Sequence, residues 1–196
     1  MNYAELFTIF FSALIINNII LMRFIALCAF FGVSDRIEPS IGMSLAVTFV
    51  MLIATPVTWL LYQHVLLPFN IQFLRTLSFI LVIASIVQFV ELFMKKYTRA
   101  LYKSLGIYLP LITTNCAILA VTFLAIDYNY NLVQAMVYTL GVAGGYSLAI
   151  IIFAGIRQRL ALAPIPKFIK GYPIVFFTAA LMSLAFMGFN GLFGIH

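Results

Sequence analysis

Apolar residues occur in six long runs along this chain, separated by shorter stretches that are richer in polar and charged residues. The runs cover residues 6–31, 41–62, 76–94, 104–126, 132–156 and 173–193. Each run reaches about 20 residues, the length that a helix rising about 1.5 Å per residue needs to cross about 30 Å of hydrocarbon. A membrane barrel would instead show apolar residues at every second position. The pattern therefore predicts an all-α polytopic membrane protein with six transmembrane helices in a single domain, residues 1–196.

The composition agrees with lipid as the solvent of most of the surface. Of the 196 residues, 65% are hydrophobic and 8% are charged, whereas soluble domains have about 45–50% apolar and about 25% charged residues. These values exclude a water-soluble globule, a disordered chain and a coiled coil. Two cysteines are too few for a disulfide scaffold, and no CxxC or HxxxH spacing offers a metal site within one segment.

The cations lie mostly on one side of the predicted membrane. Nine of the eleven Lys and Arg residues lie in the connections after the first, third and fifth helices: Arg36, Lys95, Lys96, Arg99, Lys103, Arg157, Arg159, Lys167 and Lys170. The opposite side holds Arg75, and Arg23 lies within the first helix. The positive-inside rule predicts that these three connections are cytoplasmic and that both termini are outside. Since this topogenic role accounts for the net charge of +6, we expect no nucleic-acid partner.

Polar residues enter the predicted membrane at two places. The first helix carries two amides and a guanidinium within its apolar run, at Asn17, Asn18 and Arg23. The fourth helix carries Pro110, which removes one backbone donor, and hydroxyl and amide side chains follow it. Such groups must face protein, water or a break in the helix. We therefore predict that both helices are interrupted, with the breaks lined by Asn17, Asn18, Thr113, Thr114 and Asn115.

The two interrupted segments resemble each other around their cysteines. The sequence CAFFGV from Cys28 aligns with CAILAV from Cys116, and each belongs to the first helix of a three-helix half, about residues 1–100 and 101–196. An odd number of helices in each half reverses the direction of the second half, which predicts an inverted repeat. A straight first helix would place Cys28 near its cytoplasmic end. The two cysteines therefore approach each other only if that helix is broken, tilted or re-entrant.

Cys28 and Cys116 are the only cysteines in the chain and are candidate metal ligands. Cysteine also packs as a small apolar residue in helices, and this alternative stays open on the residues alone. Thiolates in a buried site select iron–sulfur clusters, copper or zinc, and the common clusters take four thiolates. Because this chain has two, a homologous subunit or a second copy would have to supply the others.

Glycines at 141, 144 and 145 superficially suggest a nucleotide-binding loop, but no strand is predicted before them. Gly141 and Gly145 instead form a small-xxx-small face, which is typical of close packing between membrane helices.

Five stretches spread over nearly the whole chain carry a resemblance to a known family: INNIILMRFIALCAFFGVS, LRTLSFILVIASIVQFVE, LYKSLGIYLPLITTNCAIL, FAGIRQRLA and LMSLAFMGFNGL. On these stretches the chain resembles the RnfA/NqrE superfamily, and within it the A-type subunits of the Rnf complex. Quinone-reductase members usually carry Glu where this chain has Asn17 and lack the cation at Arg23. The Rnf pattern usually has Gly and Pro near the first cysteine, where this chain has Ala26 and Ala29.

The resemblance implies an electron-transfer subunit of an ion-translocating ferredoxin:NAD oxidoreductase, a translocase of the cell inner membrane that is formed by several subunits together. Cys28 and Cys116 stand at the positions that bind the iron of a 2Fe-2S cluster, which is shared with a homologous E-type subunit of inverted orientation. Flavins and further iron–sulfur clusters belong to other subunits, including the B, C, D and G types. Electron transfer is coupled to movement of Na+ or H+, and no catalytic residue is expected in this chain itself.

Two alternatives remain open on the sequence. One is an NqrE-type subunit of a sodium-translocating NADH:quinone reductase, and the other is a small secondary transporter, for which inverted repeats and broken helices are equally typical. The cysteines discriminate between redox and transport functions. A transporter should tolerate Cys28→Ala and Cys116→Ala, whereas a redox subunit should lose its cluster and its electron transfer.

Overall fold

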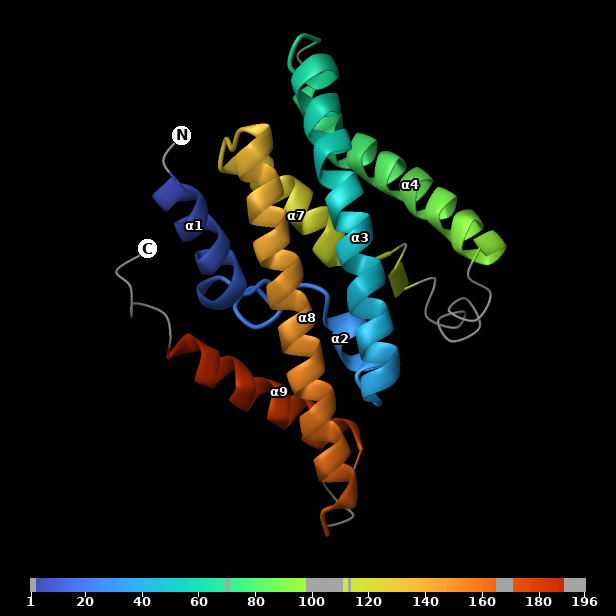
Figure 1. Ribbon diagram of the computed structural model, residues 1–196, viewed down its shortest axis with the longest axis vertical. Helices are drawn as coiled ribbons and strands as arrows, with labels where there is room; N and C mark the ends of the chain where they lie inside the picture. Colours follow the sequence, from blue (N-terminus) through green and yellow to red (C-terminus); the bar gives the residue numbers. More distant parts are fainter. Residues whose placement is uncertain (1–2, 70, 98–110, 113, 165–170, 189–196) are drawn as a thin grey trace.

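The computed structural model describes residues 3–69, 71–97, 111–112, 114–164 and 171–188, and every regular element within these ranges is helical. In chain order (Figure 1) they are α1 (Tyr3–Phe11), the π turn η1 (Ser12–Ile16), α2 (Leu27–Val33), α3 (Ile37–Leu61), the π turn η2 (Tyr62–Leu66), the 3-10 turn η3 (Gln72–Leu74), α4 (Arg75–Tyr97), α7 (Cys116–Asp127), α8 (Leu132–Leu162) and α9 (Tyr172–Met187). The predicted all-α class is confirmed.

Three helical segments in the described part of the chain are long and apolar enough to cross a membrane: Ile37–Leu66, Arg75–Leu92 and Leu132–Leu162. Three shorter apolar segments, Tyr3–Ile16, Cys116–Asp127 and Tyr172–Met187, coincide with parts of the other predicted spans. The first of these is short because its span is broken. The last predicted span continues into residues outside the described ranges. Three spans are therefore supported by length and composition, and six crossings remain a prediction.

Several helices extend beyond the apolar runs that predict them. α3 begins at Ile37 rather than at residue 41, because its polar first turn is helical and places Glu38 at the positive end of the helix dipole. α8 continues to Leu162, so Arg157 and Arg159 lie on the helix and their predicted position in a loop is wrong. An apolar run marks the part of a helix that lies in lipid and misses the polar turns beyond it. The same correction applies to both ends of α4, which include Arg75, Lys95 and Lys96.

α3 and α8 form the centre of the molecule, where they lie side by side and run in opposite directions (Figure 1). A buried hydrogen bond of 3.0 Å joins the hydroxyls of Thr55 on α3 and Thr139 on α8. Both hydroxyls also lie within hydrogen-bonding distance of the carbonyl four residues earlier, so neither is buried without a partner. Antiparallel long helices are what an inverted repeat of the two halves requires. The repeat as a whole remains a prediction.

α1 and η1 pack closely against α8 through its glycines. A Cβ atom placed on Gly141 would lie 2.6 Å from the carbonyl oxygen of Phe10, and one on Gly145 would lie 2.6 Å from the carbonyl oxygen of Leu14. Gly144 contributes as well, since its Cβ would lie 2.6 Å from the Leu14 side chain. The predicted small-xxx-small packing face is confirmed, and it fixes the first helix against α8 just before the first break.

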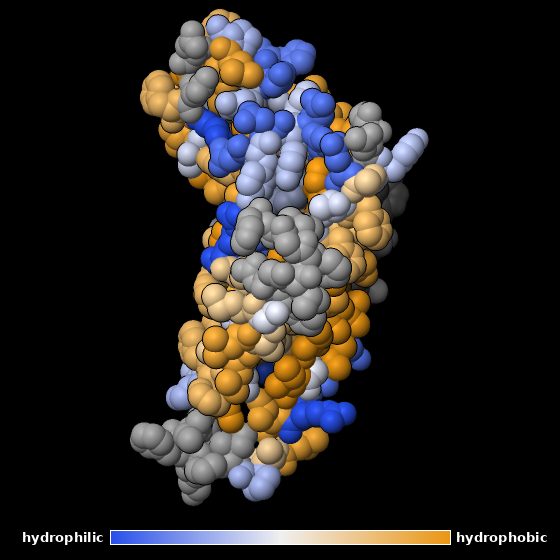
Figure 2. All heavy atoms as spheres, turned by 90° about the vertical axis from the view of Figure 1, so that its left-hand side faces the viewer, coloured by the Kyte–Doolittle hydropathy of each residue, from blue (hydrophilic) through white to orange (hydrophobic). Residues whose placement is uncertain are grey.

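The surface is largely apolar, as expected for a chain solvated by lipid. Large exposed hydrophobic side chains lie on α3, α4 and α9, including Phe49, Leu81, Phe89, Phe177 and Leu184. Figure 2 shows the side of the molecule that carries α1, where the lower half is largely hydrophobic and polar residues gather in a band in the upper half. A polar band at this position needs water, headgroups or protein beside it.

Candidate functional site

The first predicted span is broken between η1 and α2, over residues 17–26. The backbone turns there through two residues with left-handed angles, Phe24 with φ of 55° and Ala26 with φ of 68°. A residue with a Cβ is strained by about 1–2 kcal/mol in this conformation, so neighbouring contacts must hold the break in place. α2 begins directly after Ala26, and its second residue is Cys28. The predicted interruption of the first helix is confirmed.

Asn18 stabilises this break from inside the molecule. Its side chain is fully buried, and its Nδ2 donates a hydrogen bond of 2.8 Å to the carbonyl oxygen of Gly145 on α8. Its Oδ1 accepts hydrogen bonds from the backbone amides of Ile20 at 3.1 Å and Leu21 at 3.4 Å. The side-chain oxygen thus pairs two amides of the broken segment, and the side-chain nitrogen ties that segment to α8, which explains why a polar residue is tolerated here.

The second break lies immediately before α7. Thr114 is in a turn, and Asn115 is the N-cap of α7 with an extended backbone. The Oδ1 of Asn115 accepts a hydrogen bond of 3.0 Å from the amide of Ala117, and its Nδ2 donates one of 3.3 Å to the hydroxyl of Tyr146 on α8. Asparagine is favoured at the N-cap, because its side-chain oxygen accepts a hydrogen bond from a backbone amide that has no partner within the helix.

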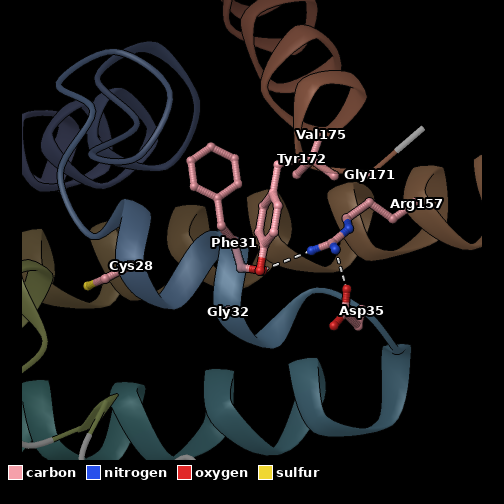
Figure 3. Close-up of a pocket in the computed structure, with 8 residues that line it drawn as sticks. All are labelled: Cys28, Phe31, Gly32, Asp35, Arg157, Gly171, Tyr172 and Val175. Atoms are coloured by element: carbon pink, nitrogen blue, oxygen red, sulfur yellow. Dashed lines mark hydrogen bonds and ion pairs between the residues drawn. The ribbon is translucent and has the colours of Figure 1, made fainter. Parts of the chain in front are cut away.

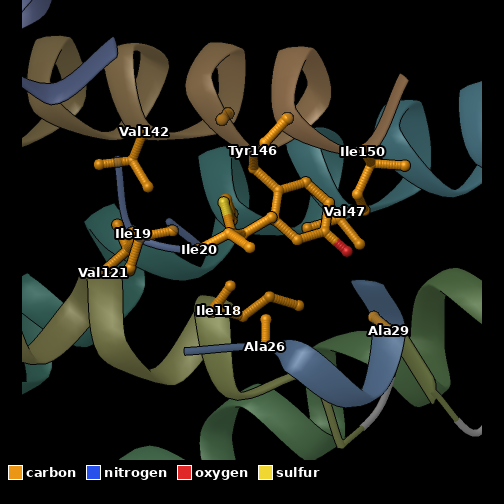
Figure 4. Close-up of a cluster of buried hydrophobic side chains, with 14 of the residues drawn as sticks. Ile19, Ile20, Ala26, Ala29, Val47, Ile118, Val121, Val142, Tyr146 and Ile150 are labelled. Carbon is orange, nitrogen blue, oxygen red and sulfur yellow. The ribbon is translucent and has the colours of Figure 1, made fainter. Parts of the chain in front are cut away.

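Both breaks are therefore attached to the same turn of α8, at the adjacent residues Gly145 and Tyr146. Figure 4 shows Tyr146 within the buried cluster, where its ring extends from α8 toward Ala26 and Ala29 of the first segment and Ile118 of α7. Its side chain is fully buried. Sequence reasoning missed this anchor, since Tyr146 reads as one more aromatic residue in an apolar helix.

The two cysteines meet at these breaks. Cys28 lies in the first turn of α2, Cys116 is the first residue of α7, and the two side chains lie close enough to interact electrostatically. Both are free thiols and both are exposed on the surface of the chain. The first helix is not straight: α2 begins only after the break, and the two cysteines come together there.

The thiol pair fits half of a four-thiolate site. No group of three or more His, Cys, Asp or Glu residues that could hold a metal ion occurs within the described ranges. Two neighbouring thiols that are exposed at the surface can bind one side of a metal centre while a second chain binds the other. Figure 3 shows Cys28 on α2 with its sulfur directed away from Arg157.

The remaining predicted residues are distributed between the breaks and a separate cavity. Thr114 is exposed, and its carbonyl oxygen lies 3.8 Å from the sulfur of Cys116. Asn17 is exposed at the start of the first break, and its Nδ2 donates a hydrogen bond of 3.2 Å to the Ser12 hydroxyl. It lines a cavity with Arg23 and does not line the one beside Cys28. Pro110 and Thr113 lie outside the described residues.

Arg157 holds the far end of the helix that carries Cys28. Its guanidinium donates hydrogen bonds of 2.8 Å to the carbonyl oxygen of Phe31 and to the hydroxyl of Ser34, and it forms an ion pair with Asp35 (Figure 3). Phe31, Asp35 and Arg157 line a cavity of about 450 Å³ that extends from Cys28 to the Asp35–Arg157 pair. From the sequence, Arg157 is predicted to be only a topogenic charge, because its partners at the end of α2 are distant in sequence.

The described part of the chain is apolar and helical, with two polar breaks and a thiol shortly after each, which defines a class of membrane protein built around interrupted helices. The chain belongs to the Rnf-Nqr subunit family: the family described as "Rnf-Nqr subunit, membrane protein" matches residues 6–193. The resemblance seen in the sequence motifs is thereby confirmed.

Relatives match over nearly their full length. A protein of Syntrophotalea carbinolica is 50% identical over 188 residues, covering 96% of this chain and 97% of the relative. One of Shewanella oneidensis is 49% identical over 189 residues, covering 96% and 98%, and one of Aeromonas salmonicida is 50% identical over 184 residues, covering 94% and 95%. Each of the three is named as the A-type subunit of an ion-translocating oxidoreductase complex.

Proposed function

We propose that this chain is an electron-transfer subunit of an ion-translocating ferredoxin:NAD oxidoreductase complex, and that Cys28 and Cys116 supply two of the four iron ligands of a 2Fe-2S cluster. A homologous subunit of inverted orientation supplies the other two. The observation that carries the proposal is the meeting of the only two cysteines, one from each half of the chain, at two helix breaks. The relatives named as subunits of ion-translocating oxidoreductase complexes support the redox assignment.

The residues around the thiols have separate roles in this proposal. Asn18 and Asn115 hold the two broken segments against α8, so the spacing of the two thiols is set before any group binds. Arg157 fixes the far end of α2. A bound 2Fe-2S cluster would supply one-electron transfer, and hydrogen bonds around its sulfurs would set its reduction potential. Exposure of both cysteines leaves the open side for the partner subunit.

Ion translocation would depend on the whole complex. Moving one charge against 100 mV requires about 2.3 kcal/mol, so the redox step must be linked to a conformational change of at least that free-energy difference. Both breaks are hydrogen-bonded to one turn of α8, so a conformational change at that turn would move both of them. Na+ and H+ are both compatible with these residues. An inner-membrane location is what the family resemblance implies, and the Lys and Arg distribution supports a topology with both termini of this chain outside.

The test uses the purified complex with Cys28→Ala or Cys116→Ala. Each variant should lose the iron and acid-labile sulfide of one 2Fe-2S cluster, together with its electron paramagnetic resonance signal, while the complex remains assembled. Gly32→Ala is the matched control on α2, because its added Cβ would lie 3.6 Å from Leu111, which is an ordinary contact. Retention of the full iron content and signal in both cysteine variants would contradict the proposal.

The same experiment addresses the alternatives. Broken helices are also typical of secondary transporters, and such a protein would keep its activity in both cysteine variants. An NqrE-type role predicts electron transfer to quinone rather than to NAD, which assays of the intact complex with each acceptor distinguish. The names of the relatives favour neither alternative.

A further inference from the structure

Arg23 is a cation in the first break whose charge is not neutralised within the described part of the chain. Its guanidinium donates one hydrogen bond of 2.6 Å to the hydroxyl of Tyr128. The two ion pairs that the structure describes are formed by other arginines, Arg75 with Asp127 and Arg157 with Asp35. A guanidinium carries five N–H donors, so most of the hydrogen-bonding capacity of Arg23 remains for another group.

A polar cavity of about 510 Å³ lies beside this guanidinium. Its polar lining consists mainly of Ser12, Asn17, Arg23, Tyr128, Tyr130 and Tyr138. Arg23 is the only charged residue among the described residues that line the cavity, so these residues give it a positive potential. Its volume lies within the range of about 300–1,000 Å³ typical of small-ligand sites.

The tyrosines supply further donors. Tyr130 lies in the connection between α7 and α8, and burial, followed by the neighbouring Tyr128, raises the pKa of its hydroxyl. Tyr130 therefore keeps its proton at neutral pH and can donate a hydrogen bond. A guanidinium with phenol hydroxyls around it is well suited to an anionic group with several oxygens, such as a phosphate.

The position of the cavity suggests where the anion comes from. Arg23 starts in the break near the middle of the molecule, but its guanidinium reaches Tyr128, directly after the end of α7 and at the same end as the start of α1 (Figure 1). Long cationic side chains extend in this way toward the headgroup layer, where tyrosine is also enriched. The side that carries α1 has a polar band above a largely hydrophobic surface (Figure 2). Ile9 and Ala13 add an apolar wall to the cavity.

We propose that this cavity binds the phosphate group of an anionic phospholipid, with Arg23 as the charged ligand and the three tyrosines as hydrogen-bond partners. The apolar wall suits the glycerol and the first carbons of an acyl chain, which a free phosphate or a carboxylate side chain of a partner subunit would leave unused. The proposal does not depend on the iron–sulfur assignment, because none of the residues that line the cavity is a cysteine.

The experiment compares spin-labelled phosphatidylglycerol with spin-labelled phosphatidylcholine on the assembled complex in phosphatidylcholine vesicles. The fraction of motionally restricted label should be higher for phosphatidylglycerol, and Arg23→Gln should reduce this preference by about fivefold or more. Arg23→Lys keeps the charge but loses the planar guanidinium with its paired N–H donors, and we expect it to reduce the preference for phosphatidylglycerol about twofold. Arg159→Gln is the matched control, since it removes the same charge from an exposed position at the end of α8 and should have no effect.

The other results would overturn the proposal. An equal preference in wild type and Arg23→Gln would show that the cavity does not select the lipid. Displacement of the label by inorganic phosphate would identify a site for a small free anion instead. Loss of a partner subunit from Arg23→Gln complexes, with the lipid preference unchanged, would identify a partner carboxylate as the counter-charge.

Discussion

The two helix breaks place a cysteine near the start of a helix by different means. The first covers residues 17–26, includes two left-handed residues and depends on the buried Asn18. The described part of the second consists of a short turn at Thr114 and the N-cap Asn115, whose backbone is relaxed. The first break is therefore strained and held by tertiary contacts, whereas the second is largely specified by local capping. We therefore expect the position of Cys28 to depend more strongly on contacts with α8 than the position of Cys116 does.

Gly145→Ala should have the largest effect. The new Cβ would lie 2.6 Å from the carbonyl oxygen of Leu14 and 3.0 Å from the Nδ2 of Asn18, so it would push the first segment away from α8. We expect a loss of about 2–3 kcal/mol in stability, the upper part of the range for overpacked cores. Thermal unfolding of the purified complex in detergent measures it.

Gly155→Ala on the same helix is the matched control. Nothing lies within 4 Å of its added Cβ, so alanine should leave stability unchanged or raise it by up to about 1 kcal/mol through helix propensity. Equal destabilisation by both substitutions would mean that the close contact at Gly145 is unimportant.

Replacing the two amides should give unequal losses. Asn18→Ala leaves the carbonyl of Gly145 and the amides of Ile20 and Leu21 without this partner inside the protein, which should cost about 2 kcal/mol. Asn115→Ala removes an N-cap and should cost about 1 kcal/mol. The same unfolding assay on both variants checks the order. A larger loss for Asn115 would reverse the comparison between the breaks.

The smallest effect is expected at the two alanines near Cys28. Ala26 has φ of 68°, where glycine is unstrained, so Ala26→Gly should leave stability unchanged or raise it by up to about 1 kcal/mol. Ala29 lies within α2, so Ala29→Gly should lower stability by about 1 kcal/mol. Opposite signs in the unfolding assay would support the left-handed turn at Ala26, and a loss at both positions would argue against it.

The sequence predicts the existence of the breaks better than their form. Polar residues in an apolar run locate the first break near Asn17 and Asn18, and the glycine spacing predicts the close packing at Gly141 and Gly145. The left-handed turn at Ala26 has no sequence signal, because alanine rarely adopts that conformation and does so here only because tertiary contacts hold it.

Long-range partners could not be predicted for a similar reason. Asn18 and Asn115 bind adjacent residues of α8, and Arg157 binds the end of α2, across sequence separations that no local pattern encodes. The sequence predicts only that Cys28 and Cys116 can come together if the first helix is broken. The structure meets that condition by starting α2 at Leu27, after the turn.

The most direct test of this account is to trap the two thiols. The complex is depleted of iron with a chelator, oxidised with copper phenanthroline and digested without reduction for mass spectrometry. We expect a disulfide-linked pair of peptides containing Cys28 and Cys116, because neighbouring thiols can form the bond without large backbone movement. Weaker trapping is expected in Asn18→Ala than in Asn115→Ala. Detection of both peptides with separately alkylated cysteines and no linked pair in the wild type would contradict the account.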